Sequence, residues 1–398
     1  MKIAFVCSHF APGTGVADYC RILAGECILQ GHSCIFLGVQ DPSISHVHFS
    51  EKAAEWNLPA VPIYSIPASY SWPRRVRVSR AILHKFEPDW VSLQFVCYGF
   101  NPKGVIFSAL PALVGLLHGF RLQIFFHELW IGGSESSTLK ERFIGRIQQE
   151  AILFLIKLLK PEIIQTSAFP FQAIMQNLGF SVSRLPIFSN IPCSSDSSDS
   201  KWLFSILNRE GCAINEGNRD IFHLYGMFGN IPPAWQGASL LEEIFKDGKA
   251  KGFIPIFIHA GRLPNSGLVV WESLVSQFQG RISMIRLGEL TVDRLSQFLF
   301  CLDVGVSPFP WVLHEKSGSL AAMRAHGLPV LVTGENLVVR GLKVKMESLE
   351  TLGTQNESEP GLFQFHADLQ VKRFPFRNTW EFVAKKFLDC LPEQRANQ

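Results

Sequence analysis

Short apolar runs alternate with amphipathic segments along most of this chain, starting at its first residues. An apolar run at residues 1–7 leads into a glycine-containing loop. In the segment after this loop, apolar side chains recur with helical spacing, at Val16, Tyr19, Ile22, Leu23 and Cys27. Gly31 ends this helix, and a second apolar run follows at residues 33–39. A strand, a helix and a strand in this order predict a βαβ unit with parallel strands.

The alternation continues to residue 180 and starts again near residue 220. In the first half we expect helices at 76–86, 104–120, 139–160 and 168–179, and strands at 88–96, 121–129 and 162–167. In the second half we expect strands at 220–229, 254–261, 282–288, 303–309 and 328–334. Helices are expected there at 237–252, 268–279, 291–302, 319–326 and 379–391. This order predicts an α/β protein with two consecutive Rossmann-like, doubly wound domains.

One shift in composition divides the chain. Residues 189–201 are rich in serine, aspartate and proline, which predicts a linker, with a surface loop inside one domain as the alternative. We therefore expect an N-terminal domain at 1–188, a linker region at 189–218 and a C-terminal domain at 219–375. The remaining residues, 376–398, hold an apolar helix that is able to pack back across the linker.

The composition narrows the class of protein. Of the 398 residues, 47% are hydrophobic and only 18% are charged, which indicates a globular chain with sizeable cores. The net charge of +3 is too small to indicate a nucleic-acid-binding protein, which needs a clustered basic face. The nine cysteines include no Cys-x-x-Cys pair. They argue against a disulfide framework or a zinc site and favour a reducing cytoplasm.

Two segments bear on membranes and targeting. Residues 104–120 are apolar, but Pro111 and His118 interrupt them, and they fall short of the roughly 20 residues that span a bilayer. We expect a buried helix there. The first residues do not resemble a signal peptide, because their apolar run is short and leads into a glycine loop. The 33 phenylalanines leave room for contact with a membrane surface, so we expect a cytoplasmic protein with any such contact at the inner membrane face.

Four loops follow predicted strands at the sheet edge where α/β proteins bind ligands. In the first loop, Gly13 and Gly15 allow the backbone to come close to a ligand, and a helix N-terminus follows. Asp18 and Tyr19 occupy the region where the third glycine of a Gly-x-Gly-x-x-Gly motif would stand, so a dinucleotide site is poorly supported. A tight turn without a ligand is the alternative.

Two further strand ends carry polar side chains. His127 and Glu128 follow an apolar strand, and the sequence lacks the His-Glu-x-x-His pattern of zinc proteases. This pair suits substrate hydroxyls or a developing charge, and a structural histidine is the alternative. Arg262 follows another strand on a glycine turn, where a guanidinium can hold a phosphate by two parallel hydrogen bonds. A solvated arginine is the alternative there.

The fourth loop lies in the stretch "HEKSGSLAAMRAHGLPV". Ser317, Gly318 and Ser319 begin a predicted helix, whose first N–H groups and dipole favour an anion. Lys316 adds a positive charge. Glu315 would repel a phosphate and is better suited to accept hydrogen bonds from hydroxyl groups. A ligand with both phosphates and hydroxyls, such as a nucleotide-sugar, fits both residues, and Ser317 as a plain helix cap is the alternative.

A basic segment lies in the first half of the chain, around Trp72. It contains Arg74, Arg75, Arg77, Arg80 and Lys85. Basic residues beside an aromatic ring can meet anionic lipid or a phosphorylated acceptor, and a solvated basic face is the alternative.

These loops, in this order, resemble the GT-B glycosyltransferases, and most closely their family-4-like group. The resemblance covers nearly the whole chain and rests on "PGTGVADYCRILAGECILQGH", "HELW", "SNIP", "AGRL" and "DVGVSPF" followed by "SGSLAAMRAHGLPVL". It implies two Rossmann-like domains that face each other across a cleft. The C-terminal domain would hold a nucleotide-diphosphate sugar, and the N-terminal domain would bind the acceptor.

The resemblance also implies roles for single residues. Gly15 would lie near the donor diphosphate or the acceptor, as would its neighbour Gly13, and Asp18, Tyr19 and Glu128 are acceptor-side candidates. His127 would contact the transferred sugar. Arg262 would hold the diphosphate. Glu315 would bind sugar hydroxyls, and the backbone of residues 317–319 would bind the phosphates.

Two positions depart from the family pattern. A second glutamate usually follows eight residues after the first, but here Ala322 or Met323 stands at that place, depending on the alignment. A lysine usually follows the Gly-Arg pair, and here Ser266 replaces it. We hypothesise that Lys316 supplies this missing charge from the neighbouring loop.

Together these features predict a glycosyltransferase that moves a sugar from a nucleotide-diphosphate sugar to a glycan, lipid-linked or small-molecule acceptor, in polysaccharide or glycoconjugate biosynthesis. The resemblance implies retention of anomeric configuration, no metal and no cofactor besides the donor substrate. Two alternatives stay open: a GT-B-type epimerase or phosphorylase, and a catalytically silent subunit that only binds a nucleotide-sugar.

Overall fold

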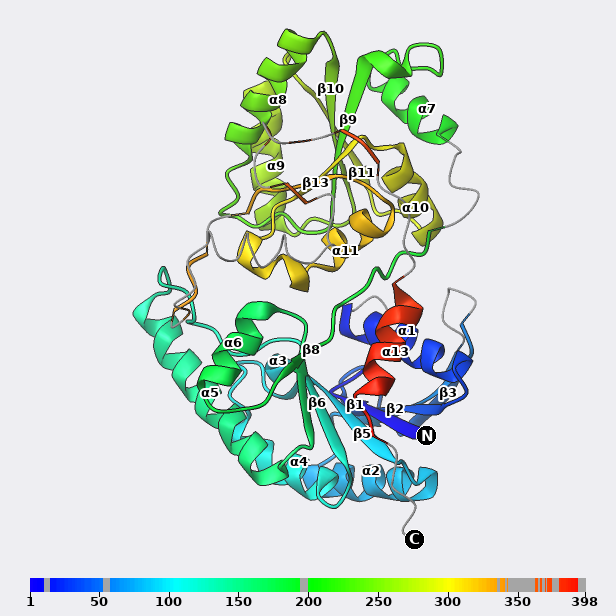
Figure 1. Cartoon of the computed structure of the whole chain (residues 1–398), viewed down its shortest axis with the longest axis vertical. Coiled ribbons are helices and arrows are strands. Elements are labelled where there is room, and N and C mark those ends of the chain that lie inside the picture. The colour runs from blue at the N-terminus through cyan, green and yellow to red at the C-terminus, as the bar shows by residue number, and fades with distance from the viewer. Residues whose placement is uncertain are drawn as a thin grey trace. The chain divides into compact units, whose positions relative to one another are not determined.

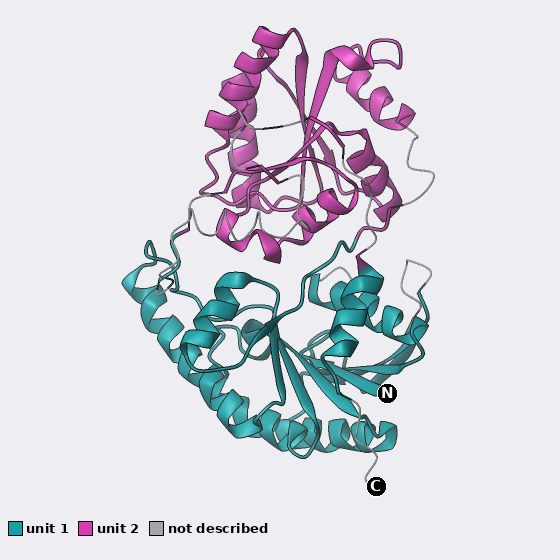
Figure 2. Ribbon diagram, in the orientation of Figure 1, with its two compact units in different colours: residues 1–190, 338–342, 380–398 teal, residues 191–337, 343–379 magenta. Residues whose placement is uncertain are grey.

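The chain forms two compact units (Figure 2). The computed structural model describes residues 1–10, 15–52, 58–193, 200–334, 337–340, 342, 362–363, 366, 369, 371–373 and 379–392. The first unit comprises Met1–Asn190, Val338–Leu342 and Trp380–Gln398, and the second comprises Ile191–Leu337 and Lys343–Thr379. In each unit, helices cover both faces of a mostly parallel sheet, so the predicted α/β, doubly wound class is confirmed.

The described part of the first unit holds an eight-stranded sheet in the order β3-β4-β2-β1-β5-β6-β7-β8. All its neighbours are parallel except β3 and β4, which form an antiparallel edge. The strands are β1 (Lys2–Cys7), β2 (Ser33–Asp41), β3 (His48–Lys52), β4 (Val61–Pro67), β5 (Trp90–Phe95), β6 (Leu122–Phe126), β7 (Ile163–Thr166) and β8 (Ser183–Arg184). The central strands are mostly apolar because helices bury them from both sides, and the few polar side chains within them are buried as well.

Two apolar cores lie on the two faces of this sheet. Successive side chains of a strand point to opposite faces, so Phe5 and Val6 of β1 belong to different cores. The helices of the unit are α1 (Gly15–Leu29), α2 (Trp72–Phe86), α3 (Cys97–Phe100), α4 (Leu110–Leu117), α5 (Leu139–Leu159), α6 (Phe169–Asn177) and α13 (Trp380–Asp389). Thr138 caps α5 in a capping box with Glu141, which explains why that helix begins where it does.

The helix near the end of the chain belongs to the first unit. Helix α13 lies beside α1 (Figure 1), and its buried side chains join the core around Phe5. The Phe387 ring stacks on Phe5 with their centroids 5.7 Å apart. The Trp380 indole nitrogen donates a hydrogen bond of 2.7 Å to the carbonyl of Ser189. The chain therefore returns to its first unit after it has built the second.

The second unit holds a parallel sheet in the order β11-β10-β9-β12-β13-β14 among its described residues. Its strands are β9 (Phe222–Phe228), β10 (Ile254–Ala260), β11 (Ser283–Gly288), β12 (Val304–Ser307), β13 (Val330–Val332) and β14 (Leu362–Phe363). Its helices are α7 (Lys201–Arg209), α8 (Gly237–Lys251), α9 (Asn265–Phe278), α10 (Val292–Cys301) and α11 (Gly318–Ala325). Side chains of α7, α10 and α11 fill the core on one face, and those of α8 and α9 fill the core on the other.

Two predicted segments differ from the structure. The segment 104–120 is not one helix: a 3-10 turn at Ile106–Ser108 precedes α4, which starts at Leu110 with Pro111 in its first turn, where a proline is tolerated. The segment 189–218, predicted as a linker, contains α7, whose side chains Leu203 and Leu207 are fully buried in the second unit. Within the described residues, the structure has no helix with the length and apolar character to cross a membrane.

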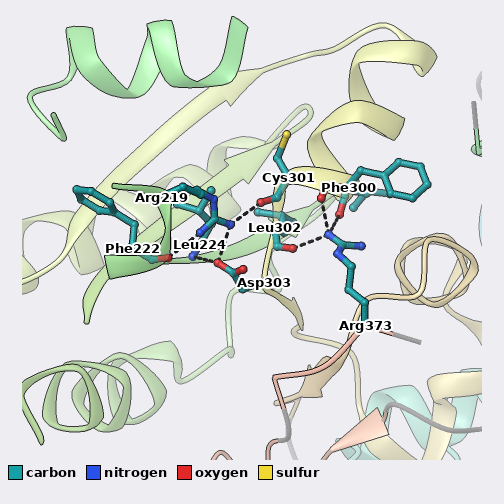
Figure 3. A network of polar contacts seen from close by, with 9 residues as sticks. Arg219, Phe222, Leu224, Phe300, Cys301, Leu302, Asp303 and Arg373 are labelled. Carbon is teal, nitrogen blue, oxygen red and sulfur yellow. Dashed lines mark hydrogen bonds and ion pairs between the residues drawn. The ribbon is translucent and has the colours of Figure 1, made fainter. Parts of the chain in front are cut away.

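Two arginines donate hydrogen bonds to backbone carbonyls at the C-terminus of α10 (Figure 3). Arg373 donates hydrogen bonds to the carbonyl oxygens of Leu299, Phe300 and Leu302. Arg219 donates to the carbonyl of Cys301 and forms an ion pair of 2.8 Å with Asp303. Because the last carbonyls of a helix lack partners within the helix, these two cations satisfy them and oppose the negative end of the helix dipole.

Candidate functional site

The first glycine loop is described in part. Gly13 lies in residues 11–14, outside the described residues. Gly15 is the first residue of α1, and apart from its chain neighbours and the backbone of α1 no atom of the described residues lies within 4 Å of the place where a Cβ would stand. The Asp18 carboxylate lies 3.6 Å from the Arg21 guanidinium, which donates a hydrogen bond to the carbonyl of Phe10. Asp18 therefore takes part in an ion pair that anchors this loop.

Tyr19 is a core residue rather than a surface group. Its side chain is 5% exposed and stacks on Phe188, with ring centroids 4.7 Å apart. Its hydroxyl has no hydrogen-bond partner among the described residues, and burial raises the pKa of this phenol well above its usual value. The ring of Tyr19 meets His127 edge to face at 5.5 Å. The structure thus brings together two of the predicted site residues, with Tyr19 supporting the His127 ring.

His127 follows β6 directly, as the sequence predicts. Its backbone N–H donates to the carbonyl of Phe95, which extends the pairing of β5 and β6 by one residue. The Nε2 atom lies 2.9 Å from the side-chain oxygen of Gln94, and the ring packs on Phe125. Glu128 is the next residue, and both side chains are half-buried. This imidazole is held on three sides at the carboxyl edge of the first sheet.

The polar partner of His127 was missed by the sequence analysis. Gln94 is fully buried in β5, and it contacts Ser92, which in turn contacts Gln123. A signal was present, because these polar residues stand inside otherwise apolar strands, two of them in β5 and one in β6. Buried polar side chains need hydrogen-bond partners, so they point to a network within the sheet.

In the second unit, Arg262 is held by a carboxylate. Its Nε and Nη2 atoms donate to the two oxygens of Glu289 at 2.7 and 3.1 Å. This ion pair raises the pKa of Arg262 and lowers the pKa of Glu289. The side chain of Arg262 is 80% exposed, so the pair is worth little to stability. Glu289 occupies the two donors that a bidentate phosphate contact would use.

Glycines turn the backbone at the carboxyl ends of three neighbouring strands. Gly229 follows β9, Gly261 follows β10 and Gly288 ends β11, with φ angles of 90°, 100° and 73°. Their N–H groups link these turns, since Gly229 donates to Ala260 and Gly261 donates to Gly288. Left-handed φ angles favour glycine, which explains the residue type at all three positions. The turn at Gly229 was missed in the sequence, although its Gly-Asn pair is a turn signal.

The stretch after β12 forms a turn followed by α11. Glu315 and Lys316 lie in a 3-10 turn, Trp311–Lys316, and both side chains are half-buried. Ser317 is the N-cap: its hydroxyl accepts a hydrogen bond of 3.3 Å from the N–H of Leu320 and lies 3.1 Å from the hydroxyl of Ser319. Gly318 is exposed, and beyond its chain neighbours and the backbone of α11 no described atom lies within 4 Å of the place of a Cβ. The turn thus places a carboxylate, a cation and a helix N-terminus close together in the sequence after β12.

The helix α11 explains why no second carboxylate is present. Ala322 and Met323 are 0% and 1% exposed, and both belong to the apolar core of the second unit. Met323 packs against the backbone of β12 at Gly305. A glutamate at either position would place a charge in this core, which is unfavourable without a partner.

Two arginines of the basic segment donate hydrogen bonds that stabilise the backbone around them. Arg75 is buried, and its guanidinium donates to the carbonyls of Tyr70 and Ala68 and to Gln40. Arg80 donates to three carbonyls at the C-terminus of α4. The exposed remainder of the segment consists of Arg74, Arg77 and Lys85. The basic face is therefore smaller than the sequence indicates.

The candidate residues fall into two groups, one in each unit. His127, Tyr19 and Glu128 gather at the carboxyl edge of the first sheet, and residues 315–319 follow β12 in the second. Arg262 follows β10 in the second unit, directly after the turn at Gly261. No group of three histidine, cysteine, aspartate or glutamate side chains with the arrangement of a metal site occurs among the residues that the structure describes.

No protein-family model and no curated protein matches the chain. Solved structures do match it. The UDP-GlcNAc 2-epimerase from Methanocaldococcus jannaschii matches with a TM-score of 0.50 and 9% identity, over 99% of this chain and 94% of that one. The catalytic domain of starch synthase IV from Arabidopsis thaliana, bound to ADP and acarbose, matches with a TM-score of 0.49 and 10% identity, over 96% and 94%. A glycosyltransferase from Rickettsia africae matches with a TM-score of 0.49 and 14% identity, over 86% of this chain and 82% of that one.

The likeness to the M. jannaschii epimerase shows the fold, so the predicted GT-B fold is confirmed. At an identity this low, the likeness carries no information about substrate or reaction. Membership of the family-4-like group stays a prediction.

Proposed function

We propose that this GT-B chain is a glycosyltransferase that uses a nucleotide-diphosphate sugar as its donor substrate. The observation that carries the proposal is the turn after β12, where Glu315, Lys316 and the N-terminus of α11 come together at the carboxyl edge of a doubly wound sheet. Ligands of such sheets bind at this edge. A cation and helix N–H groups suit a diphosphate, and the carboxylate beside them suits sugar hydroxyls.

The chemistry follows from where charge develops. Breaking the bond between sugar and diphosphate leaves negative charge on the leaving group and positive charge on the sugar ring. Lys316 and the N-terminus of α11 would stabilise the leaving diphosphate, and Glu315 would orient the sugar. Arg262 would join them after releasing Glu289. His127 would contact the transferred sugar from the first unit.

The finer parts of the proposal rest on the family resemblance. They are retention of anomeric configuration, a reaction without metal or further cofactor, and a glycan, lipid-linked or small-molecule acceptor bound by the first unit. The exposed cations Arg74, Arg77 and Lys85 support an acceptor that carries negative charge or sits at a membrane surface. The same proposal includes a cytoplasmic localisation of the protein, with peripheral contact at the inner membrane face.

A nucleotide-sugar epimerase is the second candidate, because the GT-B fold is compatible with either reaction and does not decide between them. A silent nucleotide-sugar-binding subunit is the third. The buried Ala322 and Met323 favour it, because the helix α11 has no carboxylate at the place where the family usually carries one.

A thermal-shift screen of nucleotide-diphosphate sugars is the first test, since a ligand of the native state raises its melting temperature. We expect at least one donor to raise it and to yield free nucleoside diphosphate and a glycosylated acceptor. Lys316→Ala should lower turnover by roughly 100-fold or more, as removal of a charge-stabilising donor does. Lys246→Ala, which removes the same charge from a 73% exposed position on α8, should not.

Each other outcome selects another candidate. A changed sugar that stays on its nucleotide identifies an epimerase, and binding without any turnover identifies a silent subunit. If no nucleotide-sugar raises the melting temperature, the donor site itself is refuted.

A further inference from the structure

A row of hydrogen-bonded polar side chains crosses the sheet of the first unit. We call Ser92, Gln94, Gln123, Gln165 and Ser183 the polar ladder. Its members come from β5, β6, β7 and β8, which lie side by side in the sheet (Figure 1). The first four are at most 1% exposed. The ladder starts beside His127 and ends at the edge strand β8.

All members of the polar ladder point to one face of the sheet. Ser92 is the register partner of Gln123, and Gln165 is the register partner of Ser183. Trp90 and Phe125 lie two residues from ladder members along β5 and β6, so they point to the same face, and both belong to the core that α1 and α13 cover. The ladder therefore lies in an apolar environment, where an unpaired polar atom is costly.

Each hydrogen bond of the ladder has a direction. Gln94 Nε2 donates to Ser92 Oγ at 2.7 Å, and Ser92 Oγ donates to Gln123 Oε1 at 2.6 Å. Gln123 Nε2 donates to Gln165 Oε1 at 3.1 Å, and Gln165 Nε2 donates to Ser183 Oγ at 3.2 Å. Every amide thus uses its N–H group in one direction along the row and its oxygen in the other.

This direction determines what Gln94 presents to His127. The Gln94 amide nitrogen faces Ser92, so its oxygen faces the imidazole, with Oε1 and Nε2 2.9 Å apart. A carbonyl oxygen only accepts hydrogen bonds. The proton of the neutral ring is therefore on Nε2, and the lone pair is on Nδ1.

The side-chain amide of one glutamine in the row cannot rotate by 180° without its neighbours. If Gln94 turned, its oxygen would meet Ser92 Oγ, whose only proton is already given to Gln123, so two acceptors would face each other. The opposite tautomer of His127 then requires that the whole row reverse together. Buried hydrogen-bond networks of this kind are satisfied completely or not at all, so the members act as a unit.

We propose that the polar ladder is a positioning device that holds His127 in the Nε2–H tautomer with its ring fixed at the carboxyl edge of β6. Gln94 acts on the imidazole directly, and Ser92, Gln123 and Gln165 act through Gln94. The tautomer and the ring orientation together determine which atoms His127 presents at the end of β6. Only the effect of the ladder on sugar transfer rests on the proposed function, because it treats His127 as a residue that contacts the sugar.

The direct test is nitrogen NMR of the full chain labelled at its histidine rings, at a pH where His127 is neutral. The wild-type protein should show a protonated Nε2 and an unprotonated Nδ1 for this residue. This measurement needs no variant and no substrate. A His127 ring protonated mainly on Nδ1 would overturn the proposal.

Two substitutions of Gln123 test whether the effect travels along the row, since Gln123 does not touch His127. Gln123→Met has a similar volume but offers Ser92 no acceptor, so the Nδ1–H population of His127 should rise at least threefold. Gln123→Glu still offers Ser92 an acceptor and should keep the wild-type tautomer. The control is Thr166→Val, which removes a buried hydrogen bond to the carbonyl of Phe126 from outside the ladder and should leave the tautomer unchanged.

Activity gives a separate readout. If the protein transfers sugars, kcat should fall by roughly 10-fold or more in Gln123→Met and recover in Gln123→Glu, in step with the tautomer. An unchanged tautomer in Gln123→Met refutes the ladder whatever the activity. A shifted tautomer with no detectable sugar transfer in the wild type refutes the proposed function and leaves the ladder standing.

Discussion

His326 is a buried imidazole at the end of α11, and both of its ring nitrogens are engaged. Nδ1 donates to the carbonyl of Ala322 at 2.7 Å, so Nε2 accepts a hydrogen bond of 2.9 Å from the Ser296 hydroxyl. The residue is 2% exposed, and burial lowers its pKa to about 4. The folded protein therefore keeps this histidine neutral at pH values where an ordinary histidine is charged.

We predict that His326 makes the protein sensitive to mild acid. Between pH 6.5 and 4 the unfolded chain takes up a proton at this position and the folded protein does not, so the free energy of unfolding falls as the pH falls. The loss from this residue reaches about 3 kcal/mol near pH 4. It is measured by urea unfolding at several pH values, as the difference between the wild type and His326→Asn.

The exposed His46→Asn is the control for the loss of an imidazole. It should follow the wild-type curve, while His326→Asn should be less stable at neutral pH and depend less on pH below 6.5. Parallel curves for the wild type and His326→Asn would contradict the prediction.

The sequence predicts the position of His127 but not its surroundings. A histidine directly after an apolar run lies at a strand end, and this follows from the pattern alone. Its partner Gln94 is found only through the register of β5 against β6, which the pattern does not contain. The Arg262–Glu289 pair was missed for a similar reason, because the two residues meet only where β10 and β11 pair in the sheet.

Arginines at helix C-termini are a recurring device among the elements of this fold. Arg80 of α2 donates to carbonyls at the end of α4, and Arg219 and Arg373 do the same at the end of α10. Arg373 also donates to the carbonyl of His326 at the end of α11. One side chain thus ties the ends of two helices together through four hydrogen bonds of 2.5–3.0 Å.

We predict that Arg373→Ala lowers the free energy of unfolding by about 1–2 kcal/mol, because four carbonyls lose a charged donor. Chemical denaturation of the full chain is the measurement. Lys372→Ala removes the same charge from the neighbouring exposed position and serves as the control, with an expected change within about 0.5 kcal/mol. Equal losses in both variants would show that the charge, and not the capping contacts, is responsible.

The elements that the sequence predicts well are those with a long and unambiguous pattern. The buried central strands are mostly apolar, and each of them overlaps a predicted segment, although β2 extends to Asp41, beyond the predicted 33–39. The antiparallel pair β3 and β4 was missed, since β3 is polar and prolines stand at positions 62 and 67 of β4. Helix α7 was missed because the serine-rich stretch before it reads as a linker, and its packing depends on tertiary contacts with Ile214 and Leu224 in the same core.

At the scale of the whole molecule, the first unit is built from separate parts of the chain. Its first segment ends at Asn190, after the last strand β8, and α13 returns to the unit from residue 380. The predicted boundary at residue 188 lies close to the end of the first unit. The predicted linker, in contrast, belongs largely to the second unit, because the apolar side chains of the short helix α7 pack in the core of that unit.

We predict that α13 is part of the stable core of the first unit. Phe387→Ala should lower the free energy of unfolding by about 3–5 kcal/mol, because the ring is fully buried against Phe5. Phe382→Ala removes the same ring from a 62% exposed position of the same helix and is the matched control, with little effect expected. Thermal or urea unfolding measures both, and similar losses would argue against a docked α13.

The late position of α13 has a consequence for biosynthesis. Phe387 is made 382 residues after Phe5. At the usual rates of 5–20 residues per second, the apolar face of β1 waits roughly 20–80 s for the helix that covers it. During that interval the nascent chain carries exposed phenylalanine and cysteine side chains, so the growing polypeptide is a substrate for chaperones until α13 has been made.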